Sequence, residues 1–192
     1  SFCITGSDDK FLRVWPVDFS DFFLEVEHDS PVTGVGISPN QLQVCIGTEK
    51  GSVGTMDIPS HKYVTLLRSH TDDIRQVAAD PMHAEYTTVS LDGSIRVWSD
   101  ATHEQLFEFD AKGQVPTCVM YHPKEYVFAC GFESGIVRVY NIERTSLLQE
   151  HCQHKGAVTE VLFTPNGALL LTAGSEGNIC VYDVAQNYMP VK

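Results

Sequence analysis

Short runs of alternating apolar and polar residues, separated by turn residues, follow one another along the chain. The clearest run is residues 91–98, LDGSIRVW, in which Ile95 and Val97 alternate with Arg96 and Trp98 after an Asp-Gly turn. An Asp-Gly pair before such alternation is typical of a β-hairpin. The runs are rich in Val, Ile, Thr and Tyr, and they lack the longer apolar stripe with the helical period that a helix pair needs. The pattern therefore predicts an all-β chain of short antiparallel strands.

The same pattern returns five times in one register. The large residue that closes each copy recurs after 41 or 42 residues, at Trp15, Met56, Trp98, Tyr140 and Tyr182. A proline precedes four of the hairpins at intervals of 42 residues, at Pro39, Pro81, Pro123 and Pro165. A period of about 40–45 residues, with an aromatic residue closing a strand, resembles the WD-repeat β-propeller. This resemblance implies an all-β, WD40-type propeller with four strands in each complete blade.

The repeat also predicts where each blade begins and ends. We expect five blades of one propeller, at residues 1–27, 28–69, 70–111, 112–153 and 154–192. The first is expected to supply strands near 1–6, 11–16 and 21–26. It lacks an opening strand and few residues follow Tyr182, so the first and last blades are expected to be incomplete. Propellers usually close about four to eight blades into a ring. The sequence therefore predicts a segment of about five blades from a larger ring, and a five-bladed ring closed by the two ends is the alternative.

The third blade carries the residues of a structural tetrad. The resemblance places His70, Thr88, Asp92 and Trp98 at the four positions where a histidine, a hydroxyl, a carboxylate and an indole are linked by hydrogen bonds. Such groups need partners once neighbouring blades bury them. The same residue types also permit a hydrolase-like interpretation of Thr88, His70 and Asp92, but the tetrad accounts for all three.

Other blades depart from this tetrad. The fourth blade has Lys112, Cys130 and Ser134 where histidine, threonine and aspartate are expected, and the second blade ends in Met56 instead of an aromatic residue. Gly54 lies inside a predicted strand of the second blade. A glycine there permits the close approach of backbone or a ligand, and sequence drift is the simpler explanation.

No pattern in the sequence predicts catalysis or a cofactor. The six cysteines show no CxxC spacing, and the chain has no glycine-rich phosphate loop. A metal site at residues 151–154, HCQH, is the alternative, but His154 is explained by its repeat position and no second ligand pair is in sight. We therefore expect a protein that is not an enzyme and that binds neither metal nor cofactor.

Charge narrows the class of partner. The formal net charge is −12, and no Lys or Arg occurs between Arg13 and Lys50. An acidic surface repels phosphate backbones, which argues against nucleic acid, and no apolar run is long enough to cross a bilayer. Proteins remain as the expected partners, although a solvated acidic rim is the alternative. We expect partner-binding residues in the acidic loops, at Asp18, Asp21, Asp72 and Asp73.

A narrower resemblance rests on particular stretches. The segments RVWPVDFSDFF at residues 13–23 and FACGFESGIVRVYNIE at 128–143 are similar to the centriole-proteome family of WD-repeat proteins. In that family an N-terminal domain similar to a ciliary inner-junction protein precedes tandem propellers. The resemblance implies a cytoskeletal scaffold on the microtubule wall of the centriole, basal body or axoneme of the cilium. Its propellers would recruit centriolar or ciliary scaffold proteins, and the N-terminal domain would attach to microtubules. A soluble adaptor in a ubiquitin-ligase or trafficking complex is the alternative.

The assigned register makes a prediction about stability. Replacing Trp98 by alanine should lower the free energy of unfolding by ~3–5 kcal/mol, whereas Met56→Ala should cost nearer ~2 kcal/mol, because both residues close a buried strand and differ in size. Denaturant unfolding of the two variants measures the difference. Equal and small effects at both positions would show that the register is wrong.

Overall fold

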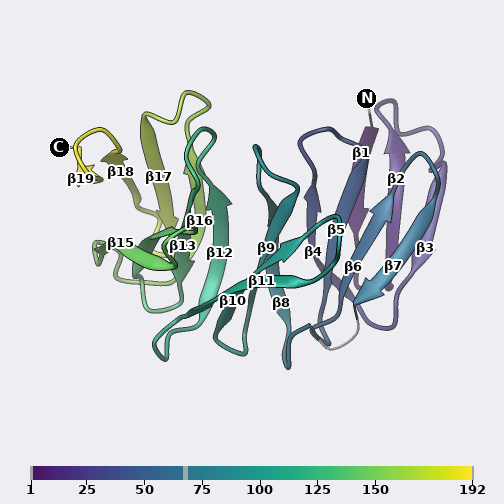
Figure 1. The fold of residues 1–192 in the computed structure, drawn as a ribbon, viewed down its shortest axis with the longest axis horizontal. Coiled ribbons are helices and arrows are strands. Elements are labelled where there is room, and N and C mark those ends of the chain that lie inside the picture. Colours follow the sequence, from purple (N-terminus) through teal and green to yellow (C-terminus); the bar gives the residue numbers. More distant parts are fainter. Residues whose placement is uncertain (1, 67–68, 192) are drawn as a thin grey trace.

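The strands of this protein form five antiparallel sheets that stand one after another along an arc (Figure 1). The structure is a computed structural model, and it describes residues 2–66 and 69–191. In every sheet, strands that are consecutive in the sequence are also neighbours. Within the described residues, no helix is long and apolar enough to cross a membrane. The predicted fold class is confirmed: the chain forms five successive sheets of a WD40-type β-propeller.

The first sheet has three strands and each of the others has four. The first contains β1 (Phe2–Gly6), β2 (Phe11–Pro16) and β3 (Leu24–Glu27). The second contains β4 (Val32–Ile37), β5 (Gln43–Thr48), β6 (Val53–Asp57) and β7 (Lys62–Leu66). The third contains β8 (Ile74–Ala79), β9 (Glu85–Ser90), β10 (Ser94–Ser99) and β11 (Gln105–Asp110). The fourth contains β12 (Pro116–Tyr121), β13 (Val127–Phe132), β14 (Val137–Asn141) and β15 (Ser146–His151). The fifth contains β16 (Val158–Phe163), β17 (Leu169–Gly174), β18 (Ile179–Asp183) and β19 (Met189–Pro190).

The first sheet departs from the strand predicted at residues 21–26. The chain turns at Phe19, which has a φ of +51° and donates its amide hydrogen to Pro16 O over 2.9 Å. Phe22 then packs edge-on against Trp15, with 5.6 Å between the ring centroids. Ladder pairing begins only where Leu24 lies opposite Val14. Residues 21–23, which were predicted to begin the strand, therefore lie in the loop, and Phe22 there contacts Trp15.

The hydrophobic core lies between adjacent sheets. Leu12 and Val14 of β2 pack in one cluster with Val44 and Ile46 of β5, and all four side chains are buried. Further clusters join the second sheet to the third, the third to the fourth and the fourth to the fifth. The buried apolar side chains of the strands therefore lie against a neighbouring sheet, as the alternating sequence pattern predicts.

Close approach of the second sheet to the third, and of the fourth sheet to the fifth, depends on glycine at one repeated position, where the third sheet has Val89. A Cβ atom on Gly47 would lie 2.4 Å from Cγ2 of Ile74, and one on Gly131 would lie 2.5 Å from Cγ1 of Val158. Both glycines are in the second strand of their sheet, and each faces the first strand of the next sheet. Only glycine lets the two backbones come this close.

A tyrosine explains the glycine inside β6. A Cβ on Gly54 would lie within van der Waals overlap of the Tyr63 hydroxyl, so the glycine leaves room for the tyrosine ring. The Tyr63 hydroxyl forms a hydrogen bond of 2.7 Å with Nδ1 of His28. This pair joins the start of the second repeat to its last strand. It occurs in the sheet that has Met56 at the position of Trp98 in the third sheet. The close approach at Gly54 is thus made by a side chain of the same sheet.

The arrangement around Gly54 predicts non-additive mutations. Gly54→Ala should lower the free energy of unfolding by ~1–3 kcal/mol, because the new methyl group displaces Tyr63 and breaks its bond to His28. In a Tyr63→Ala background the same substitution should cost less, since the clash is gone. Denaturant unfolding of the two single variants and the double variant gives the coupling. Purely additive effects would show that Tyr63 does not lie over Gly54.

Candidate protein-interaction site

The four residues of the predicted tetrad form one continuous hydrogen-bonded chain. The Trp98 indole donates to Thr88 Oγ1 over 2.9 Å, and Thr88 Oγ1 lies 2.6 Å from Nε2 of His70. Nδ1 of His70 lies 3.1 Å from Oδ2 of Asp92. An indole only donates and a carboxylate only accepts, so with a neutral imidazole, which the burial of His70 favours by lowering its pKa, the direction of the chain is fixed. The hydroxyl of Thr88 donates to His70, and His70 carries its proton on Nδ1.

Burial and hydrogen bonds set the charge states in this chain. Burial lowers the pKa of His70, although the neighbouring Asp92 acts in the opposite direction. For Asp92, burial is outweighed by hydrogen bonds from Ser94 and from the Thr71 amide, which hold its pKa well below the usual range. A neutral imidazole and an ionised carboxylate result near neutral pH. The hydrolase-like interpretation finds no support in the geometry, because Thr88 Oγ1 already bonds two side chains and is buried.

Parts of this chain recur in other sheets. In the fifth sheet Nε2 of His154 lies 2.7 Å from Thr172 Oγ1, and Nδ1 lies 2.7 Å from Oε1 of Glu176. In the first sheet the Trp15 indole donates to Thr5 Oγ1 over 2.8 Å. His154 therefore has a structural partner on each ring nitrogen, and among the described residues no group of three or more metal-ligating side chains is found.

An arginine anchor recurs as well, and the sequence analysis missed it. Arginine stands two residues before the aromatic closing residue in three sheets and pairs with a glutamate twelve positions later. The ion pairs are Arg13–Glu25 at 2.7 Å, Arg96–Glu108 at 3.5 Å and Arg138–Glu150 at 2.8 Å. Arg138 also donates to Ala111 O over 2.7 Å. In the fourth sheet, which lacks the tetrad histidine and threonine, this arginine ties the entering chain to the sheet. The regular Arg-to-Glu spacing was the signal available in the sequence.

The four acidic candidates for partner binding lie at two opposite ends of the strands. Asp18 and Asp21 are exposed in the loop between β2 and β3. Phe11 pairs with Glu27, so that loop is at the far end of β3 from Glu27. The chain enters β4 from the Glu27 end, and β4 and β8 start side by side, because Thr33 Oγ1 donates to Ile74 O over 2.5 Å. The connection that holds Asp72 and Asp73 is therefore on the other face.

The two residues of the second acidic pair differ in their surroundings. Asp72 is exposed, and its Oδ1 accepts a hydrogen bond from the Asp73 amide over 2.8 Å. Burial raises the pKa of Asp73, whose Oδ2 lies 3.7 Å from Nε of Arg75. The structure thus brings Asp72 and Asp73 together but separates them from Asp18 and Asp21. The four do not form one patch.

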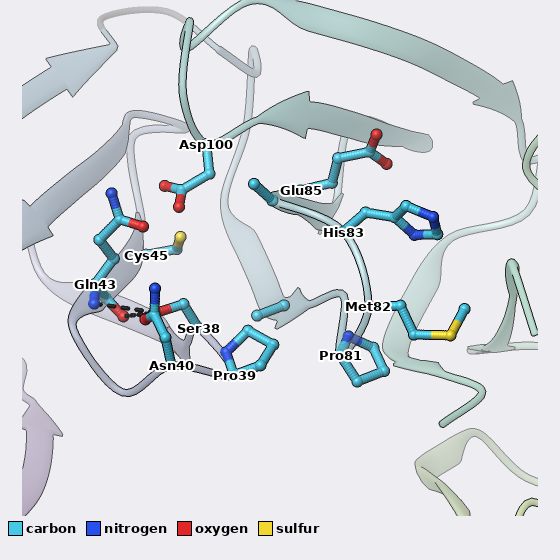
Figure 2. A pocket seen from close by; sticks show the side chains of 12 residues that line it. Ser38, Pro39, Asn40, Gln43, Cys45, Pro81, Met82, His83, Glu85 and Asp100 are labelled. Atoms are coloured by element: carbon cyan, nitrogen blue, oxygen red, sulfur yellow. Dashed lines mark hydrogen bonds between the residues drawn. The ribbon is translucent and has the colours of Figure 1, made fainter. Parts of the chain in front are cut away.

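A further acidic residue lines a groove that the sequence analysis did not predict. The groove lies between the second and third sheets and encloses about 210 Å³. We call it the inter-blade groove; it is lined by the turns at 38–40 and 81–84 and by Gln43, Cys45, Glu85 and Asp100. Figure 2 shows the Asp100 carboxylate directed towards Cys45 and Gln43, and His83 directed away from it. Asp100 and Gln43 also line an adjoining pocket of about 350 Å³.

Comparison with known proteins identifies the family. A family model described as "WDR90/POC16, second beta-propeller" matches residues 78–192, which is more than half of the chain. The chain belongs to the WDR90/POC16 family. The matched part begins in β8 and includes the tetrad residues Thr88, Asp92 and Trp98, and also Asp100. The turn at 38–40 on the other side of the inter-blade groove lies outside the matched part.

Relatives in this family cover almost the whole chain. It is 45% identical over 184 residues to WD repeat-containing protein 90 of Xenopus tropicalis, which covers 96% of the chain and 10% of that relative. It is 47% identical over 191 residues to Centriole proteome protein 16 of Chlamydomonas reinhardtii, which covers 98% of the chain and 9% of that relative. The human WD repeat-containing protein 90 is 42% identical over 183 residues. The chain therefore spans about a tenth of the length of these relatives. The resemblance stated from the sequence to the centriole-proteome family is confirmed.

The neutral state of His70 predicts a loss of stability in acid. Its folded-state pKa is lowered. Below the unfolded value of about 6.5, His70 therefore takes up a proton in the unfolded chain while it stays neutral in the folded chain. The stabilisation is full above that value and declines as the pH falls towards the folded-state pKa. Burial also lowers the pKa of His28 and His151, which adds to the slope. We expect His70→Asn to lower stability at pH ~7.5 and to flatten the decline between pH ~7.5 and ~5.

Denaturant unfolding across that pH range measures the effect. The exposed His61, on the turn before β7, gives the matched control. Asparagine tolerates the positive φ of that position, so His61→Asn should leave the slope unchanged. A slope that His70→Asn leaves as steep as in the wild type would contradict a buried neutral imidazole.

Proposed function

We propose that this chain is a non-enzymatic protein-interaction platform within a structural protein of the centriole or basal body, or of the axoneme of the cilium. The observation that carries the proposal is the similarity to Centriole proteome protein 16 over 98% of the chain. A rigid series of sheets with exposed loops at both ends suits a platform, because propellers bind partners through their loops and channels. The fold alone would not select a function.

In the part of the chain that the structure describes, the exposed loops offer surface for docking, and the reactive side chain types of the tetrad have a structural role. The tetrad residues are used in hydrogen bonds between strands. The acidic loops at both ends of the strands are exposed, and the net charge of −12 favours basic protein partners over nucleic acid. We propose that recruitment of centriolar or ciliary proteins is the role of this propeller and that microtubule attachment belongs to another part of the full-length protein. We expect it to act without metal, cofactor or membrane contact.

The blade boundaries form part of this proposal. We propose blades at residues 1–27, 28–69, 70–111, 112–153 and 154–192, because the strands of each sheet lie within one of these ranges. Partners would then meet loops from successive blades rather than from a single repeat.

Imaging of the full-length protein tests the proposal. The protein is tagged at its own locus and localised at super-resolution in ciliated cells, with and without the residues of this propeller. We expect both forms on the centriole or axoneme wall, and we expect the shortened form to lose neighbouring scaffold proteins in proximity labelling. A diffuse cytosolic signal with ligase or transport subunits as neighbours would instead support a soluble adaptor in a ubiquitin-ligase or trafficking complex.

A further inference from the structure

Asp100 is the exception at a position that is apolar in every other repeat. Two residues after the closing residue, the five repeats have Val17, Ile58, Asp100, Ile142 and Val184. The backbone at this position is the same in the second to fifth sheets, because its amide donates to a carbonyl that precedes the second strand. These bonds are Ile58 to Leu42 at 2.8 Å, Asp100 to Ala84 at 2.9 Å, Ile142 to Tyr126 at 3.2 Å and Val184 to Ala168 at 3.0 Å. Only the side chain differs.

One oxygen of the Asp100 carboxylate is buried without a hydrogen-bond partner among the described residues. The residue is 7% exposed, and its Oδ1 accepts no hydrogen bond from any described residue. Burial raises the pKa of Asp100. An unpaired buried carboxylate destabilises a fold, whereas Ile142 at the same position of the fourth sheet is fully buried in the core. Asp100 is thus a destabilising side chain at a position where an apolar side chain fits, and such departures from the local rule are expected at functional positions.

Among the described residues, His103 of the adjoining pocket is the one group whose charge acts against the raised pKa of Asp100, and no hydrogen bond joins the two side chains. No Lys or Arg is among the residues that line the inter-blade groove. His83 faces Asp80 at 3.0 Å, and Glu85 accepts a hydrogen bond of 2.5 Å from the Tyr126 hydroxyl. Nδ1 of His103, in the adjoining pocket, is 3.4 Å from Thr55 Oγ1. The groove therefore offers acceptors and a negative charge, and it lacks a cation.

The size and rim of the groove fit a single long side chain. Its volume of about 210 Å³ is below the ~300–1,000 Å³ of pockets that hold small molecules. Pro39, Pro81 and Met82 form one edge of the groove (Figure 2), and Met82 is 47% exposed. An apolar rim over a buried acid suits a side chain with an aliphatic stem and a charged head. The planar guanidinium of arginine matches a carboxylate with two parallel hydrogen bonds, which an ammonium group cannot form.

We propose that the inter-blade groove binds an arginine side chain of a partner protein, with Asp100 as its counter-ion. The inference rests on the proposed function as an interaction platform and specifies the chemistry of the partner at one place. Asp100 supplies the charge, Gln43 supplies a further acceptor, and the two prolines with Met82 contact the aliphatic stem.

Binding of defined peptide pools to the purified full-length protein tests the inference. One pool carries a single arginine at a fixed position in a random background, and matched pools carry lysine or the uncharged isostere citrulline. We expect the arginine pool to bind more tightly than the lysine pool and the citrulline pool not to bind. Asp100→Ile, which copies Ile58 and Ile142, and Asp100→Asn should each weaken the arginine pool by about 30-fold or more. Glu133→Gln removes an exposed acid outside the groove and should change nothing.

Hydrogen exchange of the same full-length variants separates a binding role from a structural one. With Asp100→Ile, peptides from β9 and β10 should exchange as slowly as in the wild type or more slowly, because an unpaired buried charge has been removed. Faster exchange would mean that Asp100 has an internal partner, such as a bound water, and would overturn the inference. Equal binding of the arginine pool by wild type and Asp100→Ile would also overturn it. Neither result depends on where the protein localises in the cell, so the proposed function stands or fails separately.

Discussion

Burial of one sheet against the next is the interaction on which this structure depends. No sheet here has a core of its own: the apolar side chains of β2 are covered by β5, and Tyr86 and Trp98 of the third sheet are covered by Cys45 and Val53 of the second. The hydrophobic effect is proportional to the apolar area removed from water. Stability therefore accrues at the junctions between sheets, and each junction constrains the residues on both of its sides. Glycine at positions 47 and 131 is one such constraint, because a side chain there would hold the sheets apart.

Polar anchors complete these junctions, and the sheets combine a few recurring anchors in different ways. The third sheet uses the chain from Trp98 through Thr88 and His70 to Asp92. The second sheet uses the pair of His28 and Tyr63. The fourth sheet relies on Arg138. What the anchors share is that the segment entering a sheet is tied to a later strand of that sheet, so a repeat can lose the tetrad and keep its shape.

Departures from the repeat thus separate into two kinds. Gly54 departs from the repeat to make room for Tyr63, and the missing histidine and threonine of the fourth sheet, at Lys112 and Cys130, are compensated by Arg138, so both departures are explained by stability alone. Asp100 departs from an apolar position, and its Oδ1 gains no hydrogen bond from the described residues. The comparison can be made within this one chain, because Ile58 and Ile142 occupy the same backbone position as Asp100 in other repeats. The acidic loop residues Asp18 and Asp72 cannot be judged in this way, since exposed loops vary without cost to the core.

The sequence by itself determined the fold class and the repeat, and it placed β1 and β2 to within one residue. The family resemblance also named the four residues that hydrogen bonds link in the third sheet. Strand periodicity and turn residues act over a few positions, so they can be read locally. It did not reveal that Phe22 packs on Trp15 and delays β3 to Leu24, because that contact depends on a turn with an unusual backbone angle. Nor did it reveal the inter-blade groove. The sequence shows Asp100 as the polar exception at an apolar repeat position, but only the packing of two sheets decides that the side chain is buried and that its Oδ1 has no hydrogen-bond partner among the described residues. Burial and hydrogen-bond partners are properties of segments about 40–60 residues apart, here β5 and the turn after β10, and they exist only once the sheets have docked.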